Sequence, residues 1–417
     1  NIFSGSYGGG NSGGIITMAY NNGGITAQVN LLGPDAKLFD RGASSYHKSI
    51  ELSFGTGNDL SVVNLNNGEM TLDAAYAKYD TTPTHFNFNG GLLKPFRDAS
   101  RLLNGTLTAA YVRERGARID TAGHSPKMAQ PLIAPTDYGV SAIALASGGS
   151  GYIGAPGVLV SGGTGVGATA IALVDLEPES ALCGQVTNIL VTSAGSGYAA
   201  GDQLSVTLHG GGCLTPAVAG QVTLTENVCG GLTKLGNGTL TLSGASTFTG
   251  GTTVSGGTLK FGCADALLPG SAVTVEAAGT LDLGGFTATN TVSGSGTVVN
   301  GTLYMEFSPG GTSVIGTQLT TLGQGAALEG VYLLDVALDG TCDKLTLNGA
   351  VELSDLTLQV VDVTRLNRDK HYVIAQVSPQ ATGVFSASNL PEGWRLQRTE
   401  DGTFRLYYSG GTFIMVK

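Results

Sequence analysis

A turn followed by a short alternating strand recurs along this chain and constrains its fold more than any other feature. Asparagine or glycine followed by glycine tolerates positive φ and turns the backbone. The Thr-Leu-Thr-Leu alternation after the turn places leucine on one face of a strand and threonine on the other. The unit recurs, complete or shortened, at residues 67–72, 89–93, 104–108, 237–242, 256–259, 278–283, 296–298, 300–303 and 348–351.

The spacing of these turns predicts a β-solenoid. The second glycines of four successive units are 19, 22 and 17 residues apart, at Gly238, Gly257, Gly279 and Gly296. This is the length of one solenoid coil, whereas antiparallel hairpins turn about every 8–12 residues. One coil cannot bury its leucine face, but stacked coils bury a continuous column. The residues expected to point inward are Leu240, Leu242, Val254, Leu259, Val273, Val275, Leu281 and Leu283.

Composition favours strands and turns and excludes several functional classes. Glycine reaches 66 of 417 residues, charged residues make up 12% of the chain, and 41% is hydrophobic. This much apolar sequence predicts a folded chain. The net charge of −10, without a basic stripe, argues against nucleic acid as a partner. No apolar run reaches about 18 residues, so we expect no transmembrane segment. The chain starts at Asn1 without a signal-peptide pattern, and we interpret it as exported and processed.

Two segments depart from the repeated unit. A duplicated Gly-Ser-Gly-Tyr motif ends at Tyr152 and Tyr198, and it predicts a small all-β insertion that protrudes from the solenoid. After the repeats the strands become longer and more aromatic, as in a terminal cap. Residues 73–78 and 98–103 carry the few helix signals. The expected division is a first solenoid segment at 1–145, the insertion at 146–228, a second solenoid segment at 229–305 and a β-rich C-terminal cap at 306–417.

Residues 230–262 closely resemble the autotransporter-associated β-strand repeat. The matching stretches are GGLTKLGNGTLTLSG at 230–244, FTGGTTV at 248–254 and GGTL at 256–259. Weaker similarity extends over 86–132, and Asp343-Lys344-Leu345 followed by Gly349 resembles a pattern near the end of such passengers. The resemblance implies an all-β, right-handed parallel β-helix. It also implies a location outside the cell or on the outer surface of a Gram-negative-type bacterium.

The five cysteines leave two interpretations open. None belongs to a CxxC pair, and none has a histidine at the spacing of a zinc site. They are either small, partly buried residues or, in an exported protein, partners in two disulfides with one thiol left over. Proximity in the chain favours the pairs Cys183 with Cys213 and Cys229 with Cys263, which leaves Cys342.

The sequence supplies no catalytic, cofactor or metal motif that its context supports. The glycine-rich stretch 163–168 lies between β segments with no helix after it, so we expect no dinucleotide site. The Asn-Gly-Thr sequons are interpreted as coil turns rather than glycosylation sites. The histidines are scattered, without the spacing of metal ligands. The sequons lie at Asn104, Asn237 and Asn300, and the histidines are His47, His85, His124, His209 and His371.

Two charged clusters have a plain and a functional interpretation. The first consists of Asp335, Asp339 and Asp343, which lack the spacing of a calcium loop and are interpreted as a solvated turn. The second is the densest group of charges in the chain, and we interpret it as an alternating surface strand, with a sugar- or partner-binding patch as the alternative. Its members are Arg113, Glu114, Arg115 and Arg118.

A structural or adhesive surface protein without enzymatic activity is the preferred function. The alternatives are a polysaccharide-active β-helix enzyme, either a lyase or a glycosidase, and a monomeric adhesin that binds host or microbial glycans. An enzyme of this kind needs paired carboxylates, or Ca²⁺ with a basic residue. The repeat region 229–305 holds too few charges for such a groove. One tryptophan and 7% aromatic residues argue against an aromatic sugar platform.

The ends of a solenoid predict self-association. Terminal coils expose unpaired backbone N–H and C=O groups, which template pairing with another chain unless a cap covers them. A short hydrophobic strand near the C-terminus is suited to add to a neighbouring sheet. Such a heterologous contact, if it does not close, builds head-to-tail oligomers or filaments. The alternative is a monomer whose last strand folds back on its own cap. The strand consists of Thr412, Phe413, Ile414, Met415 and Val416.

Overall fold

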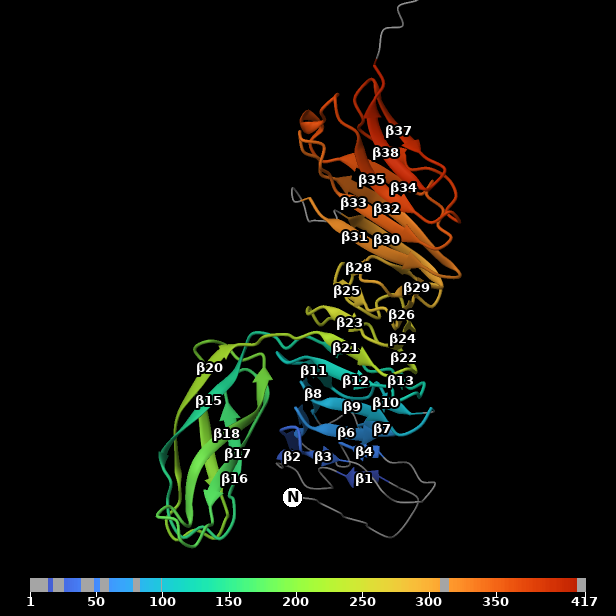
Figure 1. The fold of residues 1–417 in the computed structure, drawn as a ribbon. Helices are drawn as coiled ribbons and strands as arrows, with labels where there is room; N and C mark the ends of the chain where they lie inside the picture. The colour runs from blue at the N-terminus through green and yellow to red at the C-terminus, as the bar shows by residue number, and fades with distance from the viewer. Residues whose placement is uncertain are drawn as a thin grey trace, which may run out of the picture. The chain divides into compact units, whose positions relative to one another are not determined.

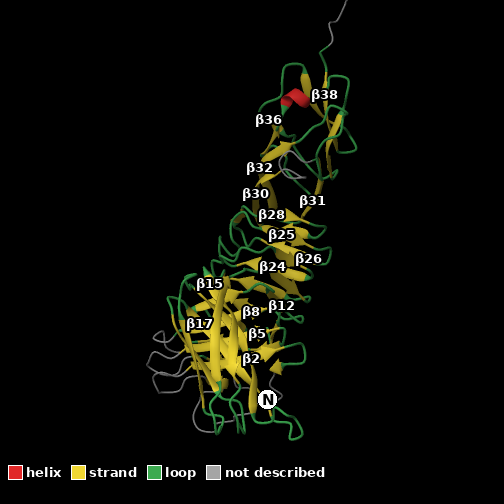
Figure 2. Ribbon diagram, turned by 90° about the vertical axis from the view of Figure 1, so that its left-hand side faces the viewer, coloured by secondary structure: helices red, strands yellow, loops and turns green. Residues whose placement is uncertain are grey.

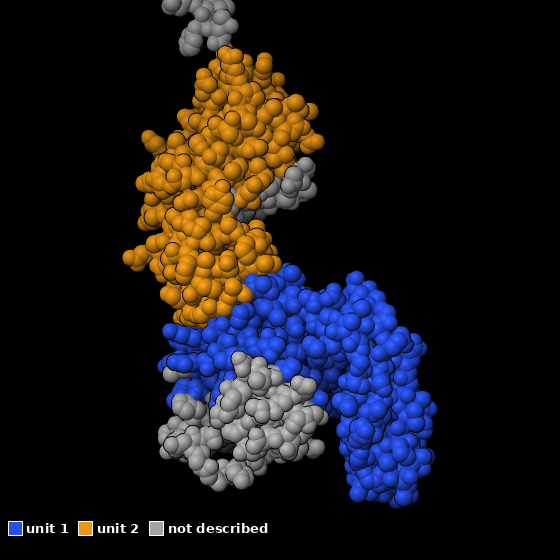
Figure 3. Space-filling view, turned by 180° about the vertical axis from the view of Figure 1, so that it is seen from behind, with its two compact units in different colours: residues 1–233, 246–250 blue, residues 234–245, 251–417 orange. Residues whose placement is uncertain are grey.

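The described part of the chain is built from β-strands and turns. The computed structural model describes residues 14–17, 26–38, 49–52, 60–77, 83–98, 100–307 and 315–410. Within these ranges the helical content is a single 3-10 turn, η1 (Val363–Arg365), drawn red in Figure 2. None of the described helices is long and apolar enough to cross a membrane. The chain divides into two compact units, 1–233 with 246–250 and 234–245 with 251–417 (Figure 3).

Three parallel sheets form the β-solenoid of the first unit, and each complete coil contributes one strand to each sheet (Figure 1). One sheet contains β1 (Gly14–Thr17), β4 (Ser49–Glu51), β7 (Ala74–Tyr76), β10 (Arg101–Leu103) and β13 (Lys127–Met128). The second contains β2 (Thr26–Leu32), β5 (Leu60–Asn66), β8 (Thr84–Asn89), β11 (Ala109–Val112) and β14 (Leu132–Ile133). The third contains β3 (Lys37–Leu38), β6 (Glu69–Leu72), β9 (Leu92–Pro95) and β12 (Ala117–Asp120).

The helix signals at 73–78 and 98–103 are wrong. Strand β7 occupies part of the first segment and β10 the end of the second. The two strands pair with each other in parallel, and Arg101 lies opposite Ala74. Stacking on a neighbouring coil therefore overrides the local helix propensity of these short segments.

Inward-facing residues stack in columns because the paired strands are parallel and in register. Leu65 of β5 pairs with Phe88 of β8, and Phe88 pairs with Val112 of β11. All three side chains are fully buried. Each coil thus supplies one element of a continuous apolar column, which no single coil can form alone.

The segment from Tyr138 to Glu226 forms antiparallel sheets that differ from the coils. Strand β15 (Tyr138–Ser147) pairs with β20 (Val218–Glu226), and Tyr138 lies opposite Glu226. The antiparallel strands therefore begin before the predicted start at residue 146. A four-stranded sheet has the order β18 (Gln185–Ser196), β17 (Val166–Asp175), β16 (Gly157–Gly162) and β19 (Leu204–His209). We call residues 138–226 the outgrowth.

The duplicated Gly-Ser-Gly-Tyr motif supplies the core of the outgrowth. Tyr152 and Tyr198 are each 4% exposed, and each belongs to a separate apolar cluster. The glycine before each tyrosine has a positive φ, 72° at Gly151 and 78° at Gly197, which turns the chain and drives the ring inward. The duplicated motif thus forms the same local structure twice, a glycine turn followed by a buried tyrosine.

The described strands of the second unit belong to three sheets. One has parallel strands β22 (Thr239–Leu242), β24 (Gly257–Phe261), β26 (Gly279–Asp282), β29 (Thr297–Val299), β31 (Thr317–Leu322), β33 (Lys344–Asn348) and β35 (Tyr372–Val377), followed by antiparallel β38 (Thr403–Tyr408) and β37 (Trp394–Arg398). The second includes β23 (Thr252–Val254), β25 (Ala272–Val275) and β28 (Thr291–Ser293). Another holds β27 (Thr287–Ala288), β30 (Gly301–Phe307), β32 (Ala326–Leu334), β34 (Leu356–Val360) and β36 (Ser386–Ala387). Strand β21 (Leu232–Leu235) spans the boundary between the units.

The register of the repeat region confirms the predicted coil lengths. Successive paired threonines are Thr239, Thr258, Thr280 and Thr297, which are 19, 22 and 17 residues apart. The eight residues predicted to point inward are all buried, with exposed fractions of 2% or less. The turn spacing therefore fixed both the coil length and the facing of the strands.

Lys234 is a buried cation inside the repeat. Its side chain is 0% exposed, and its Nζ donates to the carbonyl oxygens of Gly236, Gly238 and Gly256 at 2.6, 2.7 and 2.8 Å. Burying an ammonium is costly unless hydrogen bonds replace its hydration. The three carbonyls provide this replacement, and they join consecutive turns of the chain.

The facing of β22 predicts a large difference between two adjacent substitutions. Leu242 is 2% exposed and pairs with Phe261, whereas the half-buried Thr241 faces outward opposite Lys260. Leu242→Asp buries an unpaired charge and should cost about 4 kcal/mol or more. Thr241→Asp should change stability by less than about 1 kcal/mol. Urea unfolding followed by circular dichroism measures both, and equal losses would contradict the facing.

Candidate functional site

The outgrowth covers the outer face of the second sheet of the first unit. In β5 five successive residues, Ser61 to Leu65, are buried, so this strand is covered on both faces. The inner face packs in the solenoid core. The outer face carries three rows of side chains, which register places at Gln28-Val62-His85, Asn30-Asn64-Asn87 and Leu32-Asn66.

The middle row is a polarised chain of hydrogen bonds. Arg113 Nε donates to Asn87 Oδ1 at 2.9 Å, and Asn87 Nδ2 donates to Asn64 Oδ1 at 2.8 Å. Asn64 Nδ2 donates to Asn30 Oδ1 at 2.8 Å, and Asn30 Nδ2 donates to Gln28 Oε1 at 3.0 Å. Each bond polarises the next in a region of low dielectric constant. Parallel register makes this row possible because it places three asparagines one above another.

The same side chains hold the outgrowth. Asn64 Nδ2 donates to Thr169 Oγ1 of β17 at 3.1 Å. Asn87 Nδ2 donates to Ser193 Oγ of β18 at 3.3 Å. Further bonds from the solenoid reach backbone carbonyls of β17 and β18: Gln28 Nε2 to Ala170 O at 3.1 Å, Asn66 Nδ2 to Thr192 O at 2.8 Å and Arg113 Nη1 to Gly195 O at 2.6 Å. We call this set of contacts the polar seam.

Arg113 corrects the interpretation of its charge cluster. The residue is 6% exposed and lies in the polar seam, so it is not part of a solvated strand face. Its Cζ lies 4.7 Å from the centroid of the Tyr111 ring, a cation–π geometry. Burial lowers the pKa of Arg113 to about 10, so the guanidinium stays charged at neutral pH. The expected exposure is confirmed for Glu114, Arg115 and Arg118.

His85 is the second titratable group of the polar seam. It is 1% exposed, and its ring contacts Tyr111 edge-on at a centroid distance of 5.4 Å. Burial, and secondarily the charge of Arg113, lower the pKa of His85 to about 4. His85 Nδ1 and Arg113 Nη2 are buried without a hydrogen-bond partner in the described structure. The imidazole is therefore held neutral beside a cation.

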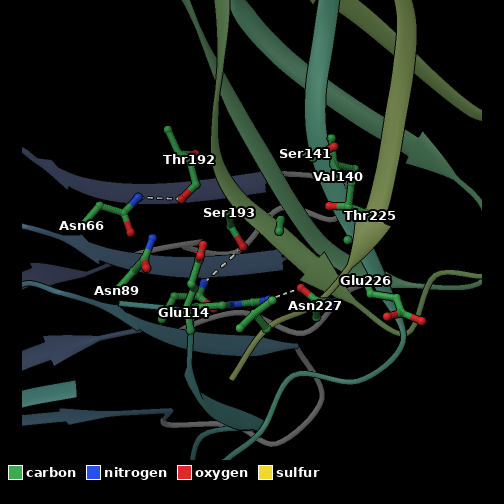
Figure 4. Close-up of a pocket in the computed structure, with 15 residues that line it drawn as sticks. Asn66, Asn89, Glu114, Val140, Ser141, Thr192, Ser193, Thr225, Glu226 and Asn227 are labelled. Atoms are coloured by element: carbon green, nitrogen blue, oxygen red, sulfur yellow. Dashed lines mark hydrogen bonds between the residues drawn. The ribbon is translucent and has the colours of Figure 1, made fainter. Parts of the chain in front are cut away.

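A polar cleft opens at one end of the polar seam (Figure 4). Its volume is about 330 Å³. The solenoid contributes the amides of Asn66 and Asn89 to one wall, and the outgrowth contributes Ser141 and Thr225 opposite them. The remaining lining residues are Asn87, Arg113, Glu114, Gly139, Val140, Thr192, Ser193, Ala194, Glu226, Asn227 and Val228.

The cleft presents donors and acceptors but few apolar surfaces. Asn227 Oδ1 accepts from Arg113 Nη1 at 3.1 Å, and Asn227 Nδ2 donates to Thr136 O at 2.9 Å. Glu114 and Glu226 are exposed at its rim, and Ser141 and Thr225 are exposed hydroxyl residues. Amides, hydroxyls and carboxylates in one hollow can pair with a ligand rich in hydroxyl groups. Of these lining residues, the sequence had indicated only the charge cluster.

The five cysteines are all free thiols, so the favoured pairs are not formed in this structure. Cys213 packs in the cluster around Tyr152, and Cys183 is exposed. Cys229 Sγ donates to Gly230 O and accepts from Thr249 N, both at 3.3 Å. These thiols therefore have other surroundings, and disulfide pairing stays a prediction for an oxidising environment.

The solvated-turn interpretation of the aspartates is wrong for two of the three. Asp343 is 0% exposed and Asp335 is 7% exposed. Asp343 Oδ1 accepts from Gly316 N at 2.7 Å and Oδ2 from Asp335 N at 3.0 Å, so this carboxylate satisfies backbone donors between strands. Asp339 lies in an exposed turn, where its bonds to Thr341 lower its pKa. The described residues contain no cluster of three or more His, Cys, Asp or Glu suited to a metal ion.

The stretch 163–168 joins antiparallel strands β16 and β17, where a dinucleotide loop would need a following helix. The predicted assembly strand, 412–416, lies outside the described residues.

One comparison with known families agrees with the repeat identified in the sequence. The passenger-associated-transport-repeat family matches residues 232–261. The crystal structure of the Haemophilus influenzae Hap adhesin is similar at 12% identity and a TM-score of 0.23, over 92% of this chain and 43% of that chain. The chain thus spans less than half the length of that adhesin. No sequence among curated proteins matches. The chain is a β-solenoid protein that carries a passenger-associated-transport-repeat at residues 232–261.

His85 predicts a loss of stability in acid. Its pKa is about 4 in the folded protein and 6.5 in the unfolded chain, so protons bind preferentially to the unfolded state. The contribution of His85 to the free energy of unfolding is complete above pH 6.5. It decreases by about 3 kcal/mol in total as the pH falls toward 4. Urea unfolding of the wild type and His85→Asn at pH 7, 5.5 and 4 measures this difference. The exposed His209→Asn serves as control, and the prediction fails if both variants show the same pH dependence.

Arg113 predicts how strongly the outgrowth is held. Arg113→Ala removes the cation that donates to Asn87, Gly195 and Asn227, and it should cost about 2–4 kcal/mol. Amides of β17 and β18 should then exchange hydrogen faster, while those of β22 and β24 keep their rates. Arg115→Ala, at an exposed neighbouring position, is the matched control. Unchanged exchange in Arg113→Ala would show that the polar seam does not depend on this residue.

Proposed function

We propose that the protein is a non-enzymatic adhesive passenger, presented on or released from the outer surface of a Gram-negative-type bacterium. The passenger-associated-transport-repeat at 232–261 supports the location. The observation that carries the binding function is the polar cleft beside the outgrowth. In this proposal the solenoid serves as a stiff support, and the outgrowth completes the binding site.

A neutral saccharide is the ligand class that the cleft fits best. Its volume of about 330 Å³ is at the small end of ligand sites, in the range of one or two sugar rings. Asn66, Asn89 and Thr225 offer both donors and acceptors, as sugar hydroxyls require. The rim carboxylates of Glu114 and Glu226 disfavour an anionic ligand.

A polysaccharide-active enzyme is the second candidate because two carboxylates share this cleft. Glycosidases use such a pair, one of them with a pKa raised by burial so that it can act as an acid. Glu114 and Glu226 are both exposed, so neither is buried as such an acid would be. Binding without cleavage is therefore the preferred reading of the geometry.

Self-association is a further part of the proposed function. Two sequence features support it: the open edge of a solenoid and the short hydrophobic strand at 412–416. Homo-oligomers or filaments would increase the number of binding sites on one assembly and raise its avidity for a surface.

Saccharide binding is tested with the intact chain on an array of plant, mucin and microbial glycans, followed by calorimetry with the strongest ligand. Asn89→Ala and Thr225→Ala should each weaken binding about fivefold to twentyfold, because each removes a hydrogen-bonding group from the cleft. Asn188→Ala, an exposed asparagine of β18 that does not line the cleft, should bind normally.

The same glycans distinguish the two candidates. If the protein releases a cleaved product and Glu114→Gln or Glu226→Gln abolishes that release, the protein is an enzyme and the binding proposal is wrong. Binding that survives both Asn89→Ala and Thr225→Ala would show that the saccharide site lies elsewhere.

A further inference from the structure

The outgrowth carries a one-sided charge. Between residues 128 and 233 the chain contains no lysine or arginine. The outgrowth itself contains five acidic residues, Asp175, Glu177, Glu179, Asp202 and Glu226. A structure of this size without a cation is repelled by anionic surfaces and attracted by cationic ones.

Three turns gather at one end of the outgrowth and expose aliphatic side chains. They join β15 to β16, β17 to β18 and β19 to β20. Ile153 is 82% exposed and Leu214 is 87% exposed. Leu176 and Leu182 are 50% and 49% exposed. We call this end the acidic tip, because Asp175, Glu177 and Glu179 lie in or beside the β17–β18 turn.

Backbone hydrogen bonds tie the three turns of the acidic tip together. Tyr152 N donates to Gly184 O, Ile153 N donates to Gly211 O, and Leu214 N donates to Ser150 O, each at 2.9 Å. The exposed leucine and isoleucine are thus held in place on a fixed backbone. Binding through such a surface loses little backbone entropy, which favours its use as a contact.

The last sheet of the second unit offers a complementary surface. Strands β35, β38 and β37 are antiparallel neighbours, and β37 is the final strand in that sheet among the described residues. Register places Val373, Arg405 and Gln397 in one row and Tyr407 with Arg395 in the next. His371 contacts Tyr407 at a ring-centroid distance of 5.9 Å.

This surface combines cations with apolar groups. We call it the basic face; its six members are His371, Val373, Arg395, Gln397, Arg405 and Tyr407. Arg395 and Arg405 are exposed, and Val373 is 37% exposed. The alternate residues Tyr372, Leu406 and Trp394 are buried, so the basic face is the outer side of the sheet. None of its six members carries a carboxylate. The carboxylate of Asp401, outside the face, has its pKa lowered by hydrogen bonds to Thr399 and Thr403 and by the charge of Arg405.

We infer that the acidic tip of one molecule binds the basic face of a second copy of this chain. This inference rests on the proposed self-association and names its surfaces. Glu177 and Glu179 would approach the two arginines, while the aliphatic side chains of the tip cover Val373 and Tyr407. The contact is heterologous, because it joins two different surfaces. A dimer therefore keeps one free tip and one free face, to which further molecules can add.

The contact differs from the strand addition expected from the sequence. Arginines on an edge strand, such as Arg395 and Arg398 on β37, act against edge-to-edge pairing of sheets. Side chains of the outer face, rather than the backbone edge, therefore make the contact. An anionic membrane is disfavoured as the partner of the tip because the outgrowth carries no cation.

Sedimentation velocity of the intact chain over a range of concentrations tests the inference. The tip variant Glu177→Lys/Glu179→Lys and the face variant Arg395→Glu/Arg405→Glu should each associate at least about tenfold more weakly than the wild type. Mixed together, the two variants should associate more strongly than either variant alone, because the reversed charges of the tip and of the face are again opposite. In that mixture the intact tip of the face variant meets the intact face of the tip variant. The wild-type association should also weaken as salt rises from 0.05 to 0.5 M.

Two controls keep these outcomes specific. Glu276→Lys/Asp355→Lys makes the same change of net charge as the tip variant at exposed positions outside both surfaces, and it should associate like the wild type. Ile153→Ser/Leu214→Ser should weaken association, whereas Leu338→Ser, at an equally apolar position 61% exposed, should not. Because all of these side chains are exposed, the variants should keep the melting temperature of the wild type.

Two results would overturn the inference in different ways. A wild type that stays monomeric at every concentration removes the proposed self-association together with these surfaces. Association that persists unchanged in the tip and face variants leaves self-association standing and rejects these surfaces. Zwitterionic and anionic lipid vesicles are included as alternative partners, and tip-dependent binding to vesicles alone would identify a lipid surface instead of a second copy.

Discussion

Backbone hydrogen bonding between consecutive coils is the constraint on which the rest of this structure depends. A parallel strand satisfies its N–H and C=O groups only when the next coil lies in register above it. Register in turn stacks like side chains in columns, with Leu240 beneath Leu259 inside and Asn64 beneath Asn87 outside. The apolar core and the polar seam are therefore two products of the same geometry.

The features that were predictable from sequence are those encoded within one or two coils. Turn residues and strand alternation are local, so the spacing of Gly238, Gly257 and Gly279 sufficed to give the register of the repeat region. Burial of Arg113 was not predictable, because the groups that cover it lie 82 and 114 residues away, at Gly195 and Asn227. A signal was present in β5, where Ser-Val-Val-Asn-Leu lacks the alternation of a solvated strand.

The polar seam shows how hydrogen-bonded side chains can hold two β structures together. The amides of Asn64 and Asn87 each make at least two hydrogen bonds, and Arg113 ends the row with a charge that strengthens the bond to Asn87. The cost is a pair of buried nitrogens without partners, on His85 and Arg113. These atoms, the low pKa of His85 and the adjacent cleft all arise from covering one face of a stacked sheet.

The pairing of Tyr138 with Glu226 has a consequence for how such a chain can change over evolutionary time. Because the outgrowth leaves and rejoins the solenoid at neighbouring points, its length places no geometric demand on the coils. Segments of other sizes and sequences can be exchanged at the same turn, provided that their ends meet. In a stacked scaffold of this kind, register constrains the sequence of the coils, whereas a segment inserted between them can change its sequence without disturbing the stack.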